Sequence, residues 1–243
     1  MEIRHIFSSY LKNFSTVLAF ALLFVFVLPF VWLQNSFVSS GTIFLDYGFI
    51  KAPILDSLLL LLLVLGFLFI YSVLVCLLIF AVRKDLGKVK TNYYLREKIH
   101  KFAIKYFIFL SVFTVGGTII ASFLLDFGVP VELVNILLII VSLSFLFLPQ
   151  TIVVDEESLR SSILTNWDFL LKNIPLVLGI FAVGSLVVFG LLLVEFVIDF
   201  FFFVGNFFSL FFSLVVFVPV LEIIKTKMYL ERFDIVRKYS LQD

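Results

Sequence analysis

Six apolar stretches, each close to the length of a membrane-spanning helix, dominate this chain and leave few folds open to it. A helix needs roughly 20 mostly apolar residues to cross about 30 Å of hydrocarbon. With 63% hydrophobic and 14% charged residues, against roughly 25% charged in a soluble domain, the chain is expected to be an integral membrane protein. The segments between the stretches are too short for a soluble domain, so residues 1–243 are predicted to form a single membrane domain. The expected spans are 14–33, 55–82, 102–125, 131–154, 174–198 and 207–224.

The basic residues fall almost entirely on one side of this map. Of the 18 Lys and Arg residues, 16 lie in the N-terminus, the 83–101 loop, the 155–173 loop and the C-terminal tail. Lys105 lies on the same side in the first turn of the third span, and Lys51 alone lies on the other side. Connections rich in Lys and Arg stay in the cytoplasm. The sequence therefore predicts a multi-pass protein of the cell membrane with both termini cytoplasmic. No small-x-small cleavage site follows the first apolar run, so we expect that run to remain as a span.

Amphipathic segments precede the odd-numbered spans. In the first segment apolar residues recur from Ile3 to Phe14 at helical spacing, and in the third they recur from Leu159 to Leu171, with Asp155 or Ser158 as the expected N-cap. The middle segment, Tyr93 to Tyr106, is less regular. Such helices lie in the headgroup plane with the apolar face down. The expected fold class is all-α: a polytopic bundle of six transmembrane helices, arranged as three helical hairpins with interfacial amphipathic helices.

Short sequence motifs also recur along the chain. Tyr10–Phe14 reads YLKNF and Leu170–Ile174 reads LLKNI, while Phe147–Pro149 and Phe217–Pro219 read FLP and FVP. These matches predict an internal repeat of three units with the same topology, unless any amphipathic helix at the inner face produces this pattern. Pro149 and Pro219 are expected to kink the fourth and sixth spans and to free backbone carbonyls that neighbours must satisfy. Alternatively, they simply steer the chain into the next interfacial segment, including the tail after Lys225.

Glu195 and Asp199 are the most distinctive acids. Four residues apart, they share a helix face near the outer end of the fifth span, beside a run of Phe residues. They are candidates for contact with an ion or substrate, or they mark the end of the span. The sequence shows no charge clearly at mid-membrane, where a functional role would be the default.

A basic cluster occupies the connection between the second and third spans. Next to a membrane such a cluster attracts anionic lipid with about 1 kcal/mol per charge; it could instead dock an acidic partner or only set the topology. The candidate anionic lipid contacts are Arg83, Lys84, Lys88, Lys90, Arg96, Lys98, Lys101 and Lys105.

The remaining candidates favour packing over chemistry. Thr114, Thr118 and Ser122 follow four-residue spacing on the third span and predict a helix-packing face, with a permeation lining as the alternative. Cys76 is expected to be buried. We predict neither a metal site nor a bound cofactor, because a zinc site needs three or four ligands and the two His residues lack such partners. Convergent polar groups are sparse, so catalytic residues and enzymatic activity are not expected.

One region resembles a known family. The stretch Leu148–Glu157, followed by Ser161–Trp167 and Leu171–Asn173, resembles a group of six-span prokaryotic proteins. That group is similar to the membrane domain attached to some glycerophosphoryl diester phosphodiesterases. The resemblance covers residues 148–190 and extends to the rest by topology. The catalytic domain of those enzymes is absent here, so the resemblance implies a membrane module that works with lipids or a partner protein.

These observations predict a non-enzymatic integral membrane module that is accessory to a partner protein or engages membrane lipid. The alternative is a small transporter or channel that uses the outer acids Glu195 and Asp199. The expected partners are membrane lipids and another membrane protein or a second copy of the chain; nucleic acid is not expected, because the basic residues follow the membrane face.

Overall fold

The computed structural model describes the backbone of residues 3–26, 29, 36–39, 41–45, 53–85, 91–202 and 204–240, and the side chains of 6–26, 29, 39, 41–42, 53–84, 98–202 and 204–231. Residues Ala19–Phe26 form a 3₁₀ helix, η1, and residues Ser213–Phe217 form a π-helix, η3. In chain order the elements are α1 (Ile3–Lys12), α2 (Phe14–Leu18), η1 (Ala19–Phe26), β1 (Ser36–Ser39), β2 (Thr42–Leu45), α4 (Ile54–Asp85), α5 (Thr91–Asp126), α6 (Val131–Leu143), α7 (Leu148–Val154), α8 (Leu159–Lys172), α9 (Ile174–Phe202), α10 (Gly205–Phe212), η3 (Ser213–Phe217) and α11 (Val218–Ser240).

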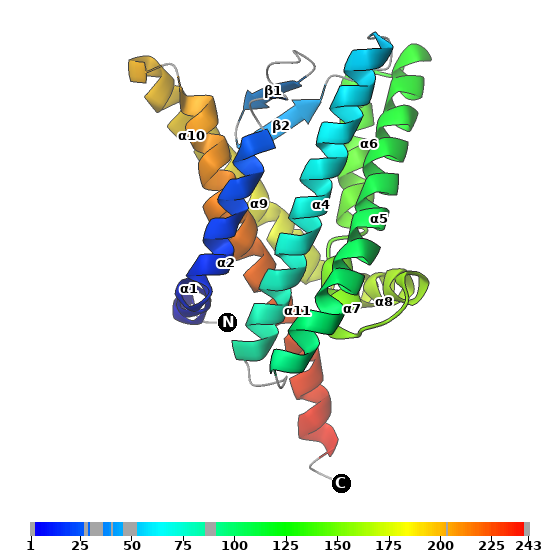
Figure 1. Cartoon of the computed structure of the whole chain (residues 1–243), viewed down its shortest axis with the longest axis vertical. Helices are drawn as coiled ribbons and strands as arrows, with labels where there is room; N and C mark the ends of the chain where they lie inside the picture. Colours follow the sequence, from blue (N-terminus) through cyan, green and yellow to red (C-terminus); the bar gives the residue numbers. More distant parts are fainter. Residues whose placement is uncertain are drawn as a thin grey trace.

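The prediction of an all-α membrane fold is confirmed. Within the described residues, five helices are long and apolar enough to cross a membrane, and a bent pair brings the number to six if it forms one span. In Figure 1 the two ends of the chain lie toward one end of the bundle and the small β-hairpin lies toward the other. We call these the inner and outer ends; that the inner end is cytoplasmic remains a prediction. The five spans are Ile54–Lys84, Lys98–Asp126, Val131–Val154, Ile174–Phe202 and Gly205–Glu231.

The bent pair consists of an amphipathic helix and the start of the first span. The segments Ile6–Lys12 and Phe14–Phe26 meet at 78°, as expected for an interfacial helix that leads into a span. Within Phe14–Phe26, Val17, Phe20 and Leu23 are fully buried. Their three-residue spacing matches the 3.0 residues per turn of the 3₁₀ helix η1, which places Phe20 and Leu23 on one face.

An antiparallel hairpin at the outer end is an addition to the predicted fold. Strands β1 and β2 pair Ser39 with Thr42 next to the turn, where Gly41 has a φ of +73°. A Cβ at Gly41 would lie 2.7 Å from Leu191 and 2.8 Å from Ser213. Glycine is required here both for the left-handed backbone and for the close approach of the hairpin to α9 and η3.

The middle amphipathic segment was predicted wrongly as a separate interfacial helix. Residues Tyr93 to Tyr106 belong to α5, which continues without a break to Asp126. No proline or glycine lies between Thr91 and Val115, so nothing in the backbone chemistry ends the helix there. The third segment behaves as predicted: α8 is a separate helix that lies across the spans in Figure 1, and its N-cap is Ser158, whose side chain accepts from the Ser161 N–H at 3.3 Å.

Both interior prolines lie immediately after a disturbance of the helix. Pro149 is in the first turn of α7, behind the break at 144–147, and Pro219 follows the π-helix η3. Proline cannot donate to the carbonyl four residues earlier and its ring crowds that carbonyl. For Pro219 this is Val215, whose oxygen instead accepts a hydrogen bond from the Tyr10 hydroxyl at 3.2 Å. The prediction that a neighbour satisfies a freed carbonyl is confirmed at this proline.

The last helix is buried more deeply than predicted. The sixth span was placed at 207–224 with an interfacial tail after it, but α11 continues to Ser240 and its buried residues extend to Leu230. Lys225, Thr226 and Tyr229 are buried. Thr226 contacts Gln150 on α7, a helix whose residues are all buried. Aromatic rings fill the space around them: Phe169 lies 4.8 Å from Phe147 and 4.9 Å from Tyr229 between ring centroids.

Candidate functional site

Polar side chains that lie far apart in the sequence come together at the inner half of the bundle. They come from α4, α5, α7, α8 and α11 and form two adjoining groups. The first is a buried core around Glu222, and the second surrounds the turn between α7 and α8. We call these the buried polar core and the α7–α8 junction.

The buried polar core centres on an ion pair inside the sixth span. Lys225 Nζ lies 2.5 Å from Glu222 Oε1, and both side chains are at most 5% exposed. Gln150 from α7 donates from Nε2 to Glu222 Oε2 at 2.8 Å, and the Thr226 hydroxyl donates to the Glu222 carbonyl at 2.7 Å. Because a buried charge is costly unless it is paired and hydrogen-bonded, these contacts explain how the bundle tolerates a carboxylate here.

Several groups with their own polar atoms surround this ion pair. Tyr71 and Cys76 on α4 and Tyr106 on α5 lie within electrostatic reach of Glu222. Cys76 is buried, as predicted. The Gln150 Oε1 atom is buried without a hydrogen-bond partner among the described residues. The core is therefore polar, largely satisfied within the chain, and shared by α4, α5, α7 and α11.

The helix break before Pro149 positions α7. The side-chain amide of Asn166 hydrogen-bonds to the two backbone groups that the break leaves without helical partners. Asn166 on α8 accepts at Oδ1 from the Phe147 N–H at 3.1 Å and donates from Nδ2 to the Ser144 carbonyl at 2.7 Å. Both backbone groups lost their helical partners at the break. Asn166 is fully buried, and an unsatisfied buried backbone group is costly. The asparagine therefore holds the interrupted span together and fixes α8 against it.

The α7–α8 junction is formed by three consecutive acids with different partners. Asp155 accepts from the Tyr229 hydroxyl. Glu157 accepts at its carboxylate from Ser161 at 2.6 Å and Thr165 at 3.2 Å. These two carboxylates thus bind hydroxyl groups and fasten the start of α8 to itself and to α11.

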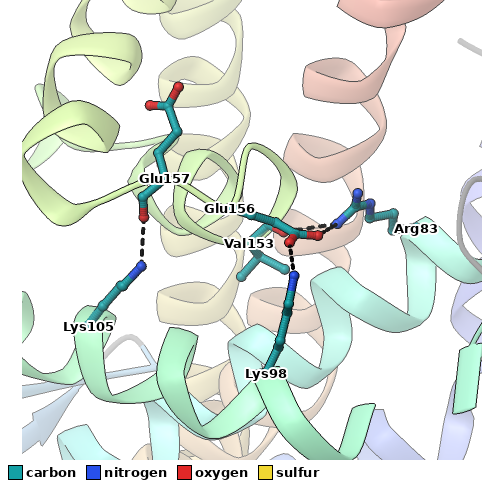
Figure 2. A network of polar contacts seen from close by, with 6 residues as sticks. All are labelled: Arg83, Lys98, Lys105, Val153, Glu156 and Glu157. Atoms are coloured by element: carbon teal, nitrogen blue, oxygen red, sulfur yellow. Dashed lines mark hydrogen bonds and ion pairs between the residues drawn. The ribbon is translucent and has the colours of Figure 1, made fainter. Parts of the chain in front are cut away.

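Glu156 binds two cations. Arg83 Nη1 lies 3.2 Å from Glu156 Oε1, and Lys98 Nζ lies 2.6 Å from Oε2. Arg83 also donates to the Val153 carbonyl at 3.1 Å, and Lys105 donates to the Glu157 carbonyl at 2.7 Å. Figure 2 shows the three basic side chains converging on the turn from α4 and α5. Glu156 has a φ of +58°, an uncommon conformation for a residue with a side chain.

The structure divides the predicted lipid-contact residues into groups. Arg83, Lys98 and Lys105 bind the α7–α8 junction, whereas Lys84 and Lys101 are exposed. Lys88, Lys90 and the side chain of Arg96 lie outside the described residues.

The outer acids Glu195 and Asp199 hydrogen-bond to the segment in which α10 follows α9. Asp199 Oδ1 accepts from the Gly205 N–H at 2.6 Å, and Glu195 Oε2 accepts from the Ser209 hydroxyl at 2.9 Å. A Cβ at Gly205 would lie 2.4 Å from the Glu195 carbonyl, so glycine is required where α10 folds back on α9. Both acids are therefore bound to α10, and their proposed contact with an ion or substrate stays a prediction.

Of the other sequence candidates, Thr118 donates to the Thr114 carbonyl one turn earlier at 2.7 Å. Thr114, Thr118 and Ser122 are partly buried. His100 is exposed, and the side chain of His5 lies outside the described residues.

The expectation that convergent polar groups are sparse was wrong. Sequence reasoning missed Gln150, Asn166, Glu222, Lys225 and Tyr229. Glu222 was assigned to the last turn of a span ending at 224, and Lys225 to an interfacial tail. The available signal was their three-residue spacing, which places them on one helix face, in a helix whose apolar pattern resumes at Met228–Leu230.

Comparison with known proteins gives this chain no relative: no family model matches it, and neither does a curated protein or a solved structure. The chain is a polytopic helical membrane protein with five or six candidate spans.

Proposed function

We propose that this chain is a non-enzymatic integral membrane module that engages anionic membrane lipid at its inner face, or assists a partner membrane protein there. Lipid engagement has the stronger support, from one observation. Basic side chains of two helices bind the α7–α8 junction, at the level where α4 has its last turn and the span Val131–Val154 ends. Lipid phosphates lie at the ends of spans, and each nearby Lys or Arg adds about 1 kcal/mol of attraction to an anionic leaflet.

The sequence resemblance supports the same class of function. It covers residues 148–190, which include α7, the junction and α8. In this part of the chain the polar side chains bind one another and hold helices in place, as the contacts of Asn166, Asp155 and Glu157 illustrate. Such a framework suits a module that presents a fixed surface to its surroundings.

The proposal is tested by native mass spectrometry of the protein extracted gently from its own membrane. We expect retained anionic lipid that decreases in a Lys84→Gln/Lys101→Gln variant, because both side chains are exposed beside the junction. Lys172→Gln is the control, since this lysine already pairs with Asp168 at the far end of α8. A stoichiometric partner protein without lipid would favour the accessory role. Neither lipid nor partner would contradict the proposal.

Transport is the second candidate, and the buried ion pair favours it. Ionisable groups inside a membrane often mark the pathway of an ion or proton, and Glu222 and Lys225 lie within the sixth span. The sequence suggests Glu195 and Asp199 at the outer end for the same role. Proteoliposomes loaded with a pH-sensitive or sodium-sensitive dye test it: transport requires a flux that Glu222→Gln removes and Glu132→Gln preserves. No flux in the unmodified protein would exclude these two ions as substrates.

A further inference from the structure

The α7–α8 junction contains a pair of cations that is occupied by the chain's own carboxylate. Arg83 reaches Glu156 from the end of α4, and Lys98 reaches it from α5, so one carboxylate lies between two basic groups. The side chain of Lys98 is 40% exposed and that of Glu156 is 23% exposed. This ion pair is therefore accessible from the membrane surface, unlike the one at Glu222.

Glu156 differs from its neighbours in what holds it. Asp155 and Glu157 bind hydroxyl groups that fasten α8 and α11. The carboxylate of Glu156 binds Arg83 and Lys98, and its backbone adopts the left-handed φ of +58°. A residue with a side chain is strained in this conformation. The strain is tolerated in a state in which the carboxylate fills the gap between the two cations.

The position and charge of this pair match a lipid phosphate. Arg83 lies in the last turn of α4, and Glu156 follows directly after the span Val131–Val154, which fits a position near the boundary between hydrocarbon and headgroups. Arginine binds phosphate oxygens in a forked geometry, and lysine adds a point charge. The exposed Lys84 and Lys101 adjoin Arg83 and Lys98 on the same helices and extend the positive surface.

We propose that Arg83 and Lys98 form a binding site for the phosphate of an anionic phospholipid, and that Glu156 occupies this site when the lipid is absent. The inference rests on the proposed lipid engagement and specifies its site. A lipid phosphate replaces the Glu156 carboxylate as the partner of both cations. The α7–α8 turn, relieved of its anchor at Glu156, then relaxes from the left-handed conformation. Bound lipid and the conformation of the turn are thereby coupled.

The test uses the full chain in nanodiscs of phosphatidylcholine that contain increasing fractions of phosphatidylglycerol. Native mass spectrometry measures the phosphatidylglycerol retained and gives an apparent Kd. Removing an internal competitor that fills the site about nine-tenths of the time raises apparent affinity about tenfold. We therefore expect Glu156→Gln to raise the affinity by about that factor, and Arg83→Gln combined with Lys98→Gln to abolish the preference for phosphatidylglycerol.

Glu157→Gln is the matched control, because it removes one negative charge from the same turn but frees no cation. It should change the affinity much less than Glu156→Gln. If Glu156→Gln folds poorly, Glu156→Gly removes the carboxylate while tolerating the positive φ. Equal affinities in wild type, Glu156→Gln and Glu157→Gln would overturn the inference but leave lipid engagement intact. Absence of phosphatidylglycerol from every variant would contradict lipid engagement itself.

A further arm separates the two sources of phosphate. Excess inorganic phosphate is added to nanodiscs that hold the Glu156→Gln variant. We expect it to leave the retained phosphatidylglycerol unchanged, because the lipid is also held by its acyl chains. Complete displacement by inorganic phosphate would identify the site as one for a soluble anion and overturn the assignment to lipid.

Discussion

The inner and outer ends of this bundle use the same kinds of contact over very different distances along the chain. At the outer end, Asp199 binds Gly205 and Glu195 binds Ser209, which are 6 and 14 residues away. At the inner end, Gln150 binds Glu222 and Arg83 binds Glu156, over 72 and 73 residues. Glu195 and Asp199 therefore shape a turn at the outer end, whereas Glu156 and Glu222 fix separate helices against one another at the inner end.

The comparison assumes that the two ends face opposite sides of the membrane. Cys76 is buried, so introduced cysteines can be labelled selectively. In intact cells an impermeant thiol reagent should label Glu132→Cys at the outer end and leave Arg160→Cys on α8 unlabelled, because the basic loops stay inside. Both positions are exposed. The reverse pattern would invert the predicted orientation, and labelling of both in lysed cells is the control for reactivity.

The largest loss of stability is expected from breaking the buried ion pair. Glu222→Gln leaves Lys225 buried without a charged partner and should lower the free energy of unfolding by about 3–5 kcal/mol. Thermal unfolding in detergent measures this, with the exposed Glu132→Gln as control. Replacing both residues by Met should cost less than Glu222→Gln alone, since no unpaired charge remains. A double variant that is less stable than the single one would contradict an electrostatic origin.

A smaller loss is expected at the break in the fourth span. Asn166→Ala leaves the Phe147 N–H and the Ser144 carbonyl without the amide that binds both. Unsatisfied buried groups of this kind cost about 1–3 kcal/mol. The same unfolding measurement applies, with the exposed Arg160→Ala on the same helix as control. Stability equal to that of the control would show that the break does not depend on α8.

The contact between the first and last spans is expected to be weaker. Tyr10→Phe removes the hydroxyl that donates to the Val215 carbonyl and keeps the ring. The expected loss is about 0.5–1.5 kcal/mol, and hydrogen exchange should increase around η3. Tyr93→Phe provides the control, because it makes the same change at the start of α5. Unchanged exchange at η3 would mean that the freed carbonyl has another partner.

The smallest loss of stability is expected from Asp199→Ala, and this variant tests most directly whether contacts at the outer end act only locally. Asp199→Ala removes a cap-like contact to the Gly205 N–H and should lower stability by no more than about 1 kcal/mol. Hydrogen exchange should rise in α10 alone and leave α7 and α8 unaffected. An increase that reached α7 would show that the outer turn is coupled to the inner end, and the proposed division between local and long-range contacts would fail.

The lengths of the apolar stretches predicted most of the fold, because each length can be read from consecutive residues without knowledge of distant partners. The predicted spans 55–82 and 131–154 correspond to Ile54–Lys84 and Val131–Val154. The continuous helix α5 was missed because its amphipathic start resembled α1 and α8, which end at Lys12 and Lys172, each followed by an asparagine. No comparable break follows Tyr106. The β-hairpin was missed because Gly41 is required mainly by its approach to α9 and η3.

The polar sites were harder to predict, for a physical reason. Whether Glu222 and Lys225 are exposed at an interface or buried depends on α7, whose Gln150 lies 72 residues earlier. Nothing in the residues next to Glu222 indicates that Gln150 is its partner. Ser158 as the cap of α8 and the need to satisfy a carbonyl near Pro219 were predictable, because both follow from backbone geometry within a few residues.

The hydrogen bond between Tyr10 and Val215 also has a consequence for the order in which the protein is made. Its two partners are separated by 205 residues. At about 5–20 residues per second of synthesis, the first helix waits about 10–40 s for this partner to emerge. Until then the interfacial helix α1 and the start of the first span are inserted without their anchor in the sixth. Chains truncated before η3 lack that anchor altogether, so the first span then depends on its other contacts.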